Sequence, residues 1–190
     1  MFTALLTKQA TTVTGIFYPV GATDDGWIST LGGFDDSGDL FACGTWSGDP
    51  AEAFIRFSNV SIPQGSTIVS SYLRLNGYSA PGTPPRIHKV YANIEIDPDS
   101  PTSTVEFNAL DLTTAYVQWT PTFVSGYEWI DSTDISTIIQ EIVNQGLWVS
   151  GNHLIILLKE NATAAFNLIY YNSIRVSSGI YKAELHISYQ

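Results

Sequence analysis

Hydrophobic and polar residues alternate along most of this chain. The clearest case is segment 181–189, where tyrosine, alanine, leucine and isoleucine occupy every second position between polar residues. When hydrophobic residues recur at every second position of a strand, their side chains all face the core, and the polar side chains between them face water. Similar patterns predict further strands over residues 13–18, 53–57, 67–75, 86–96, 115–119, 153–158 and 164–171.

These short strands are separated by segments rich in glycine, proline and aspartate, for which we expect loops at 21–26, 32–39, 44–50, 79–85 and 97–104. Many short strands with such punctuation are typical of two packed antiparallel sheets. The sequence shows no internal repeat and no linker, so it predicts one domain over residues 1–190: an all-β, jelly-roll-like antiparallel β-sandwich. The expected core includes Phe54, Phe57, Tyr72, Leu73, Leu75, Ile155 and Leu157.

Between residues 131 and 146 the period changes to that of a helix, because isoleucine and valine recur on one face at 135, 138, 139, 142 and 143. This pattern predicts one short α-helix at about 133–145, with Ile138 and Ile142 docked on the sandwich. Ser132 or Thr133 is the expected N-terminal cap. Gly146 is expected to end the helix in a left-handed conformation.

Charge excludes two classes of partner. The chain carries 18 acidic and eight basic residues, a formal net charge of −10, which repels phosphate backbones and anionic lipid surfaces alike. The basic residues are scattered singly, and the longest strongly apolar run, 154–158, is too short to span a bilayer. We therefore expect neither nucleic acid nor a membrane as a partner.

Cys43 is the only cysteine, so the chain cannot form an internal disulfide, and its apolar neighbours predict a buried, inert thiol. The first residues lack a basic start followed by an apolar block. That start predicts a protein made and used without a signal peptide.

Three segments, taken in order, resemble a known group of domains. They are AFIRFSNVSIPQGSTIVSSYLRLNG at 53–77, TTAYVQWT at 113–120 and DISTIIQEIVNQGLWVSGNHLIILL at 134–158. This order resembles the jelly-roll modules of the DNRLRE-like, carbohydrate-binding-module-like group, found in bacteriophage virion proteins and bacterial surface proteins. The DNRLRE string itself is absent, and the shared features are packing and turn signatures, which transfer fold better than function.

The resemblance implies a non-catalytic bacteriophage virion structural protein, either a head decoration (cement) protein or a fibre-associated domain. It would bind capsid or tail proteins in the virion, after assembly in the host bacterial cytoplasm, as a homo-oligomer with a trimer favoured by analogy. Segment 1–14 is predicted to be an N-terminal arm or an edge strand. As an arm, it would bring Phe2, Leu5 and Leu6 into contact with another chain.

The alternative function is a glycan-binding module that attaches to a host cell-surface polysaccharide. Trp27 and Trp46 stand among aspartate, glycine and serine residues, and with Tyr78 they could stack on sugar rings. The competing interpretation is that these rings seal the ends of the sandwich.

Several acidic residues have the type and spacing of metal-binding or catalytic groups. Asp35, Asp36 and Asp39 place three carboxylates in one glycine-bearing turn, which suits a structural calcium ion, although such clusters commonly form plain turns. Asp24 with Asp25, and the group Glu95, Asp97 and Asp99, are carboxylates of the type that hydrolases use. No Gly-x-Ser-x-Gly string occurs, and His88, His153 and His186 lie in separate strand patterns, so we expect no enzyme.

Overall fold

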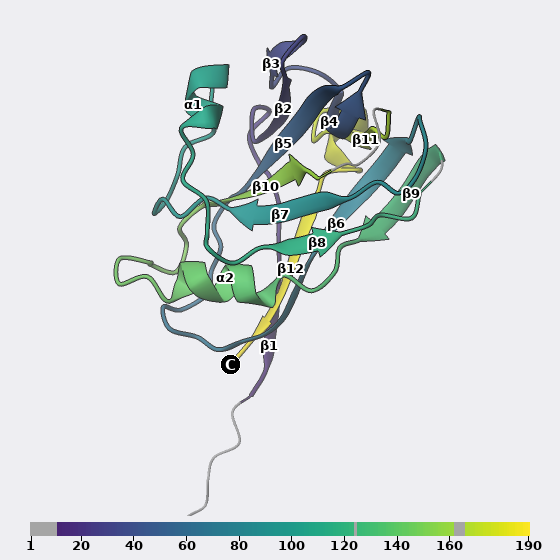
Figure 1. Cartoon of the computed structure of the whole chain (residues 1–190). Coiled ribbons are helices and arrows are strands. Elements are labelled where there is room, and N and C mark those ends of the chain that lie inside the picture. Colours follow the sequence, from purple (N-terminus) through teal and green to yellow (C-terminus); the bar gives the residue numbers. More distant parts are fainter. Residues whose placement is uncertain (1–10, 124, 162–165) are drawn as a thin grey trace, which may run out of the picture.

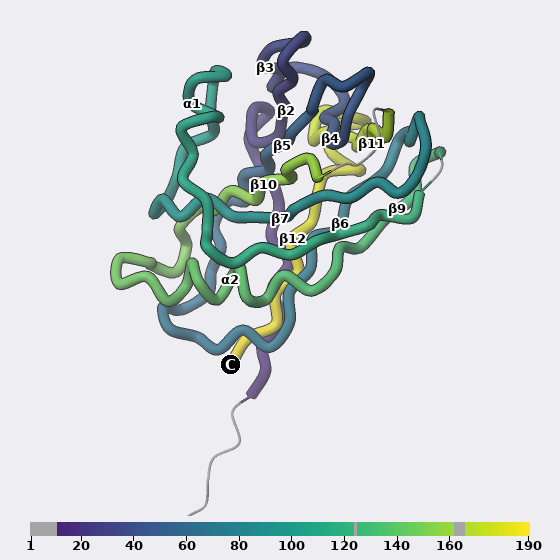
Figure 2. The backbone as a smooth tube through the Cα atoms, viewed as in Figure 1, coloured from purple at the N-terminus to yellow at the C-terminus, as the bar shows by residue number. Residues whose placement is uncertain are grey.

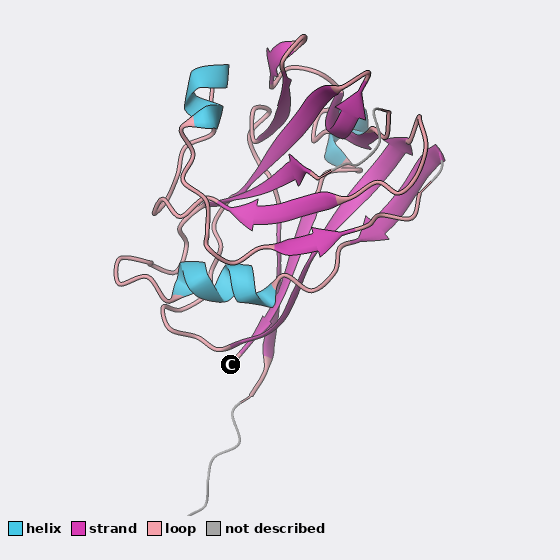
Figure 3. Ribbon diagram, in the orientation of Figure 1, coloured by secondary structure: helices cyan, strands magenta, loops and turns pink. Residues whose placement is uncertain are grey.

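The computed structural model describes residues 11–123, 125–161 and 166–190. These residues form a mostly antiparallel β-sandwich with short helices at its ends, as Figures 1 and 3 show, which confirms the predicted fold class. The strands are β1 (Val13–Phe17), β2 (Asp25–Ser29), β3 (Gly33–Asp35), β4 (Leu40–Trp46), β5 (Asp49–Phe57), β6 (Ile68–Ser79), β7 (His88–Ala92), β8 (Val117–Trp119), β9 (Ser125–Asp131), β10 (Leu154–Glu160), β11 (Ile169–Asn172) and β12 (Glu184–Tyr189). The helices are α1 (Thr104–Asn108), α2 (Ser136–Val143) and the 3₁₀ turn η1 (Val176–Gly179).

The strands follow one curled path in the order β1-β12-β6-β11-β4-β5-β10-β7-β8, while β2 and β3 extend from β5 and β9 pairs with β6. Figure 2 shows the same strands as a tube through the Cα atoms, coloured along the sequence. Strand β4 joins the two halves: its first part pairs with β11, and its second part pairs with β5. Gly44 lies at the change of partner with φ +128, and a Cβ there would come within 2.6 Å of the Asn167 carbonyl oxygen. Only glycine allows so close an approach.

The main core fills the space between the two halves and includes the expected Phe57, Leu73 and Leu75. Tyr72 was expected there too, but it is only half-buried. Because Leu73 and Leu75 face inward, the alternation turns Tyr72 outward, where its ring stacks on His186 at 4.5 Å.

A second core covers the opposite face of β5 and β10. The expected core residues Phe54, Ile155 and Leu157 lie there together with Phe107 of α1. Both faces of these central strands are therefore buried, although the sequence pattern predicted only one buried face. Helix α1 was not predicted: the expected loop 97–104 ends at its first residue, and 105–108 was assigned to no element. The signal was present: Ser103 Oγ accepts a hydrogen bond from the Glu106 amide at 3.2 Å, an N-cap with the Ser-x-x-Glu spacing.

Helix α2 confirms the helical pattern but is shorter than predicted. Its N-cap is Ile135 without a side-chain bond; Ser132 Oγ instead accepts from the Leu73 amide at 2.9 Å, tying the entry of the helix to β6. Gly146 does not have a positive φ, because the chain leaves the helix through further right-handed turns at Asn144. The buried face, with Ile138 and Ile142, packs against β6 and β7 as expected.

Strands β2, β3, β4 and β9 were not predicted, and parts of the first three occupy segments assigned to loops. Strand β1 forms an edge strand that pairs antiparallel with β12 from Val13 to Phe17. Of segment 1–14, Val13 and Thr14 belong to this strand. Phe2, Leu5 and Leu6 lie outside the described residues.

None of the helices in the described part of the chain has the length and apolar character needed to cross a membrane.

Candidate functional site

Trp27 and Trp46 line the same surface hollow, of about 360 Å³, although they come from different strands. We call it the aromatic pocket. Trp27 lies in β2 and Trp46 ends β4, and Tyr170 of β11 provides a third ring. The complete lining is Trp27, Ser29, Leu31, Gly32, Trp46, Asp49, Ala51, Leu168 and Tyr170.

Small residues beneath the rings create the hollow. Ala42, Ala51 and Leu168 form a small buried cluster, and Trp27 and Tyr170 pack against it. Ala51 lies on β5 between its partners Ser29 of β2 and Gly44 of β4. Because the side chain of Ala51 is short, it leaves open space on this surface, and the larger rings of Trp27, Trp46 and Tyr170 line that space.

A tight hairpin sets the position of Trp46. Ser47 and Gly48 have φ values of 51° and 84°, so the turn between β4 and β5 has both central residues left-handed, the form that matches the twist of a hairpin. Trp46 pairs with Asp49 across this turn. Its ring meets Phe166 edge-on at 4.5 Å between centroids, yet 47% of the residue stays exposed. The ring is thus held in place while a large part of it meets solvent.

Asp49 supplies the polar side of the aromatic pocket. Its carboxylate accepts hydrogen bonds from the backbone amides of Thr30 at 2.8 Å and Leu31 at 3.3 Å. Burial acts to raise the pKa of Asp49, but hydrogen bonds from Leu31, Ser29 and Thr30 outweigh it and hold the pKa below its usual range. The group is therefore an ionised acceptor at neutral pH. Among the described residues, no Lys, Arg or His lines the pocket.

Tyr78, the third predicted stacking residue, is not part of the aromatic pocket. Its ring meets Tyr127 of β9 edge-on at 5.8 Å, and Tyr127 in turn lies 4.9 Å from Tyr181. These three tyrosines form a separate surface cluster. Tyr170 takes the place expected for Tyr78, and the sequence had no signal for it beyond its position in a predicted strand.

Residues 35–39, which we call the aspartate turn, are held together by hydrogen bonds within the loop and to neighbouring segments. Asp35 Oδ1 accepts hydrogen bonds from the Ser37 amide and hydroxyl, both at 2.9 Å, and from the Gly38 amide at 3.0 Å. Arg175 donates to the carbonyl oxygens of Asp36 and Gly38, so a guanidinium provides the positive charge at this loop. The Asp39 carbonyl accepts from the Ser173 amide at 2.9 Å.

Within residues 11–123, 125–161 and 166–190, no three His, Cys, Asp or Glu side chains are arranged to hold a metal ion. The structure thus does not bring Asp35, Asp36 and Asp39 together as a calcium ligand set. The physical reason is that the Asp35 carboxylate is occupied by the amides of its own turn.

The other carboxylates singled out in the sequence hold loops together. Asp24 accepts hydrogen bonds from the Gly21 amide at 2.6 Å and from Arg56 Nη1 at 3.1 Å. Asp25 is buried and accepts from the Ser173 hydroxyl and the Ile174 amide, both at 2.7 Å. Asp97 lies 2.6 Å from Nδ1 of His153. The neighbours Asp24 and Asp25 thus bind different parts of the fold.

Of the three histidines, His88 is fully buried. Its Nε2 atom is hydrogen-bonded to the Tyr171 hydroxyl. His186 stacks on Tyr72 and contacts Glu184 at 2.7 Å. Cys43 is buried as predicted, and burial raises the pKa of its thiol well above the usual value.

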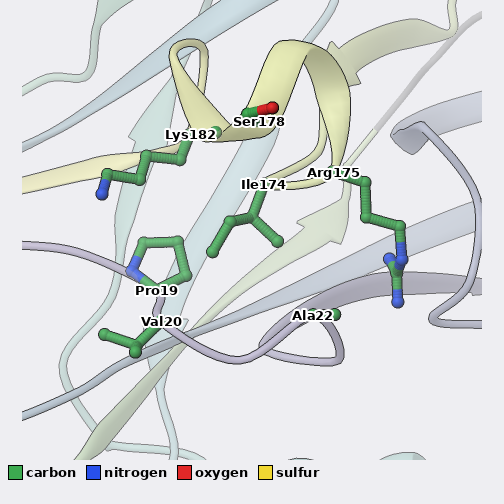
Figure 4. Close-up of a pocket in the computed structure, with 8 residues that line it drawn as sticks. Pro19, Val20, Ala22, Ile174, Arg175, Ser178 and Lys182 are labelled. Carbon is green, nitrogen blue, oxygen red and sulfur yellow. The ribbon is translucent and has the colours of Figure 1, made fainter.

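A further hollow, of about 350 Å³, lies between the segment after β1 and the turn η1. Figure 4 shows Lys182 and Arg175 on either side of Ile174, with their charged groups pointing away from each other. The Lys182 ammonium lies over the Tyr18 ring at 4.6 Å, and Arg175 binds the carbonyls of the aspartate turn. Both cations are thus engaged elsewhere, and this hollow presents no converging polar groups.

No protein-family model matches the sequence, and no curated protein matches it either. The function is therefore inferred from the geometry of the site.

Proposed function

We propose that this protein is a non-catalytic binding module that recognises a neutral saccharide in the aromatic pocket. The observation that carries the proposal is the convergence of Trp27, Trp46 and Tyr170 around one hollow that has Asp49 on its polar side. This fits the glycan-binding alternative inferred from the sequence, with Tyr170 in place of Tyr78.

Aromatic rings and a carboxylate together match the surface of a sugar. The apolar face of a pyranose ring packs on an indole, which buries CH groups without removing its hydroxyls from water. Those hydroxyls can donate to Asp49, whose ionised oxygens make stronger hydrogen bonds than neutral acceptors do. The described lining of the pocket includes no cationic residue, and the chain carries a net charge of −10, so acidic polysaccharides are disfavoured.

The test is a glycan array, followed by calorimetric titration of the best neutral ligand. Trp46→Ala should weaken binding by about tenfold or more, as expected for loss of about 1.4 kcal/mol or more of stacking and burial. Trp129→Ala is the matched control, because Trp129 is a similarly exposed tryptophan on β9 outside the pocket. Equal losses in the two variants, or no neutral glycan bound by the wild type, would overturn the proposal.

A second candidate function, assembly into a bacteriophage virion, rests on the resemblance seen in the sequence, and the edge of the sandwich supports the association with another chain that it requires. Among the described residues, β1 pairs with a strand on one side only, and Val13 and Ile16 on it are exposed, as is Val69 nearby on β6. An open edge with exposed apolar residues favours pairing with another copy of the chain. On this proposal the protein is a head decoration or fibre-associated component that binds capsid or tail proteins as a homo-oligomer.

Mass spectrometry of purified virions tests this second function, and absence of the chain from every particle would reject it. Deletion of residues 1–12 tests the predicted contacts of Phe2, Leu5 and Leu6. A folded truncated chain that elutes as a monomer would support an assembly arm. A folded chain with unchanged association would remove the arm from the proposal.

A further inference from the structure

Arg86 is a buried cation without an acidic partner. It lies just before β7 and is 7% exposed. Its Nη2 atom donates to the carbonyl oxygens of Ala80 and Gly82, but its buried Nε has no hydrogen-bond partner. All 18 acidic residues of the chain fall within the described ranges, and none of them forms an ion pair with Arg86.

This arrangement is unfavourable as it stands. A buried charge is costly unless it is paired and hydrogen-bonded, and two carbonyl dipoles on one nitrogen offset only part of that cost. Burial also lowers the pKa of Arg86, although an arginine side chain remains charged in proteins. An anionic group bound beside this side chain would offset its charge.

A hollow of about 670 Å³ lies next to this side chain, with Arg86 in its lining. We call it the Arg86 pocket. Pro84, Pro85, Pro121 and Phe123 provide apolar walls, while Thr120 and Thr122 add hydroxyl groups. Phe123 is anchored by close packing against Gly77 of β6, where a Cβ would come within 2.8 Å of its ring. The hollow therefore combines a fixed apolar wall with the side chain of an arginine that has no acidic partner among the described residues.

Glu128 of β9 also lines the Arg86 pocket, and it is exposed. A carboxylate in this position repels a second negative charge on a bound ligand. Ligands with one anionic group are favoured over dianions such as phosphate esters.

We propose that the Arg86 pocket binds a small ligand that carries a single carboxylate on an apolar body. The carboxylate pairs with the positive charge of the Arg86 guanidinium, and the apolar body packs against the prolines and Phe123. This site is separate from the aromatic pocket and does not depend on the saccharide proposal.

Titration of the whole protein with benzoate and with benzamide, followed by NMR or calorimetry, tests the proposal. The two probes have nearly the same shape, but only benzoate is charged. Benzoate should bind about tenfold more tightly or better, since hydrogen bonds to a charged group contribute more than neutral ones. Equal affinity of the two probes, or no binding of benzoate, would overturn the proposal.

Glu128→Gln provides a second measurement that leaves Arg86 in place. Removing the negative charge at the pocket should strengthen benzoate binding several-fold and leave benzamide unchanged. Asp131→Asn, on the same strand but outside the pocket lining, is the control for a general change in surface charge. If both variants shift benzoate affinity equally, the effect is not local and the assignment of the Arg86 pocket fails.

Arg86→Lys keeps the charge but loses the planar fork. It should weaken benzoate more than benzamide, provided that the variant folds without the bonds to Ala80 and Gly82. If it does not fold, the Glu128→Gln comparison decides the proposal alone.

Discussion

The Nε2 atom of His88 lies 2.8 Å from the hydroxyl oxygen of Tyr171, and both side chains are fully buried in the middle of the sandwich. The Trp119 ring meets His88 edge-on at 5.6 Å, which closes the site from the side of β8. Burial lowers the pKa of His88 from 6.5 to about 3. A neutral imidazole is thus built into the core, with consequences for the response of the fold to acid.

The first prediction concerns acid stability. The pKa of His88 is lower in the folded protein than in the unfolded chain. Its contribution to the free energy of unfolding is therefore intact above pH 6.5 and is lost as the pH falls toward 3. Relative to His88→Gln, the wild type should lose about 2–3 kcal/mol of unfolding free energy between pH 7 and pH 4.5. Urea unfolding at both pH values measures the difference. Parallel pH profiles of the two proteins would contradict the prediction.

The second prediction has the opposite sign and concerns Asp25. Burial raises its pKa to about 6, against the hydrogen bonds from Ser173 and Ile174 and the charge of Arg175. Its contribution is therefore fully present below pH 3.8 and is lost as the pH rises through about 6. From pH 4 to pH 7, the stability of Asp25→Asn should rise relative to wild type by about 2.5 kcal/mol.

The neighbour Asp24 is the matched control for Asp25. Burial acts to raise its pKa, but hydrogen bonds from Gly21, Val20 and Ser100, with the charge of Arg56, lower it overall. The contribution of Asp24 to the free energy of unfolding is therefore present above pH 3.8 and is lost as the pH falls below that value. Asp24→Asn should therefore lose stability relative to wild type at neutral pH. The same pH trend in both variants would show that the environments of the two carboxylates are wrongly assigned.

The third prediction tests the docking of α2. Ile142 lies on the buried face of the helix, whereas Thr137 on the same helix is exposed. Ile142→Ala should cost about 2–5 kcal/mol, through lost burial and an unfilled cavity, while Thr137→Ala should change stability by less than about 0.5 kcal/mol. Chemical denaturation measures both. Similar midpoints for the two variants would mean that the helix face is not docked.

The fourth prediction tests the second core. Phe107 is the buried residue of α1 and packs with Phe54, Ile155 and Leu157. Phe107→Ala should cost about 3–5 kcal/mol, whereas Val105→Ala, on the exposed side of the same short helix, should cost little. Hydrogen exchange should also show faster exchange of the amides in α1 for Phe107→Ala. Unchanged exchange there would indicate that α1 is held by its caps alone.

The amino-acid sequence by itself determined the local elements whose side-chain period is complete within one segment. The alternation over 181–189 predicted β12 with Leu185 and Ile187 inward, and the isoleucine stripe predicted the buried face of α2. These patterns are readable because neighbours along the chain decide which side of a strand or helix each residue occupies. Tyr72 was placed in the core because its ring is large. Its position in the alternation, next to the inward-facing Leu73, instead turns it outward.

Only the tertiary structure decided which segments become neighbours. Phe54, Ile155 and Leu157 belong to a core separate from the main one, and they are buried because α1, together with Phe34 of β3 and the segment after α1, packs over them. Likewise, Trp27, Trp46 and Tyr170 share a pocket only because β4 changes partner from β11 to β5. Such contacts depend on strand pairing between distant segments, and the local period of a strand carries no information about its partner.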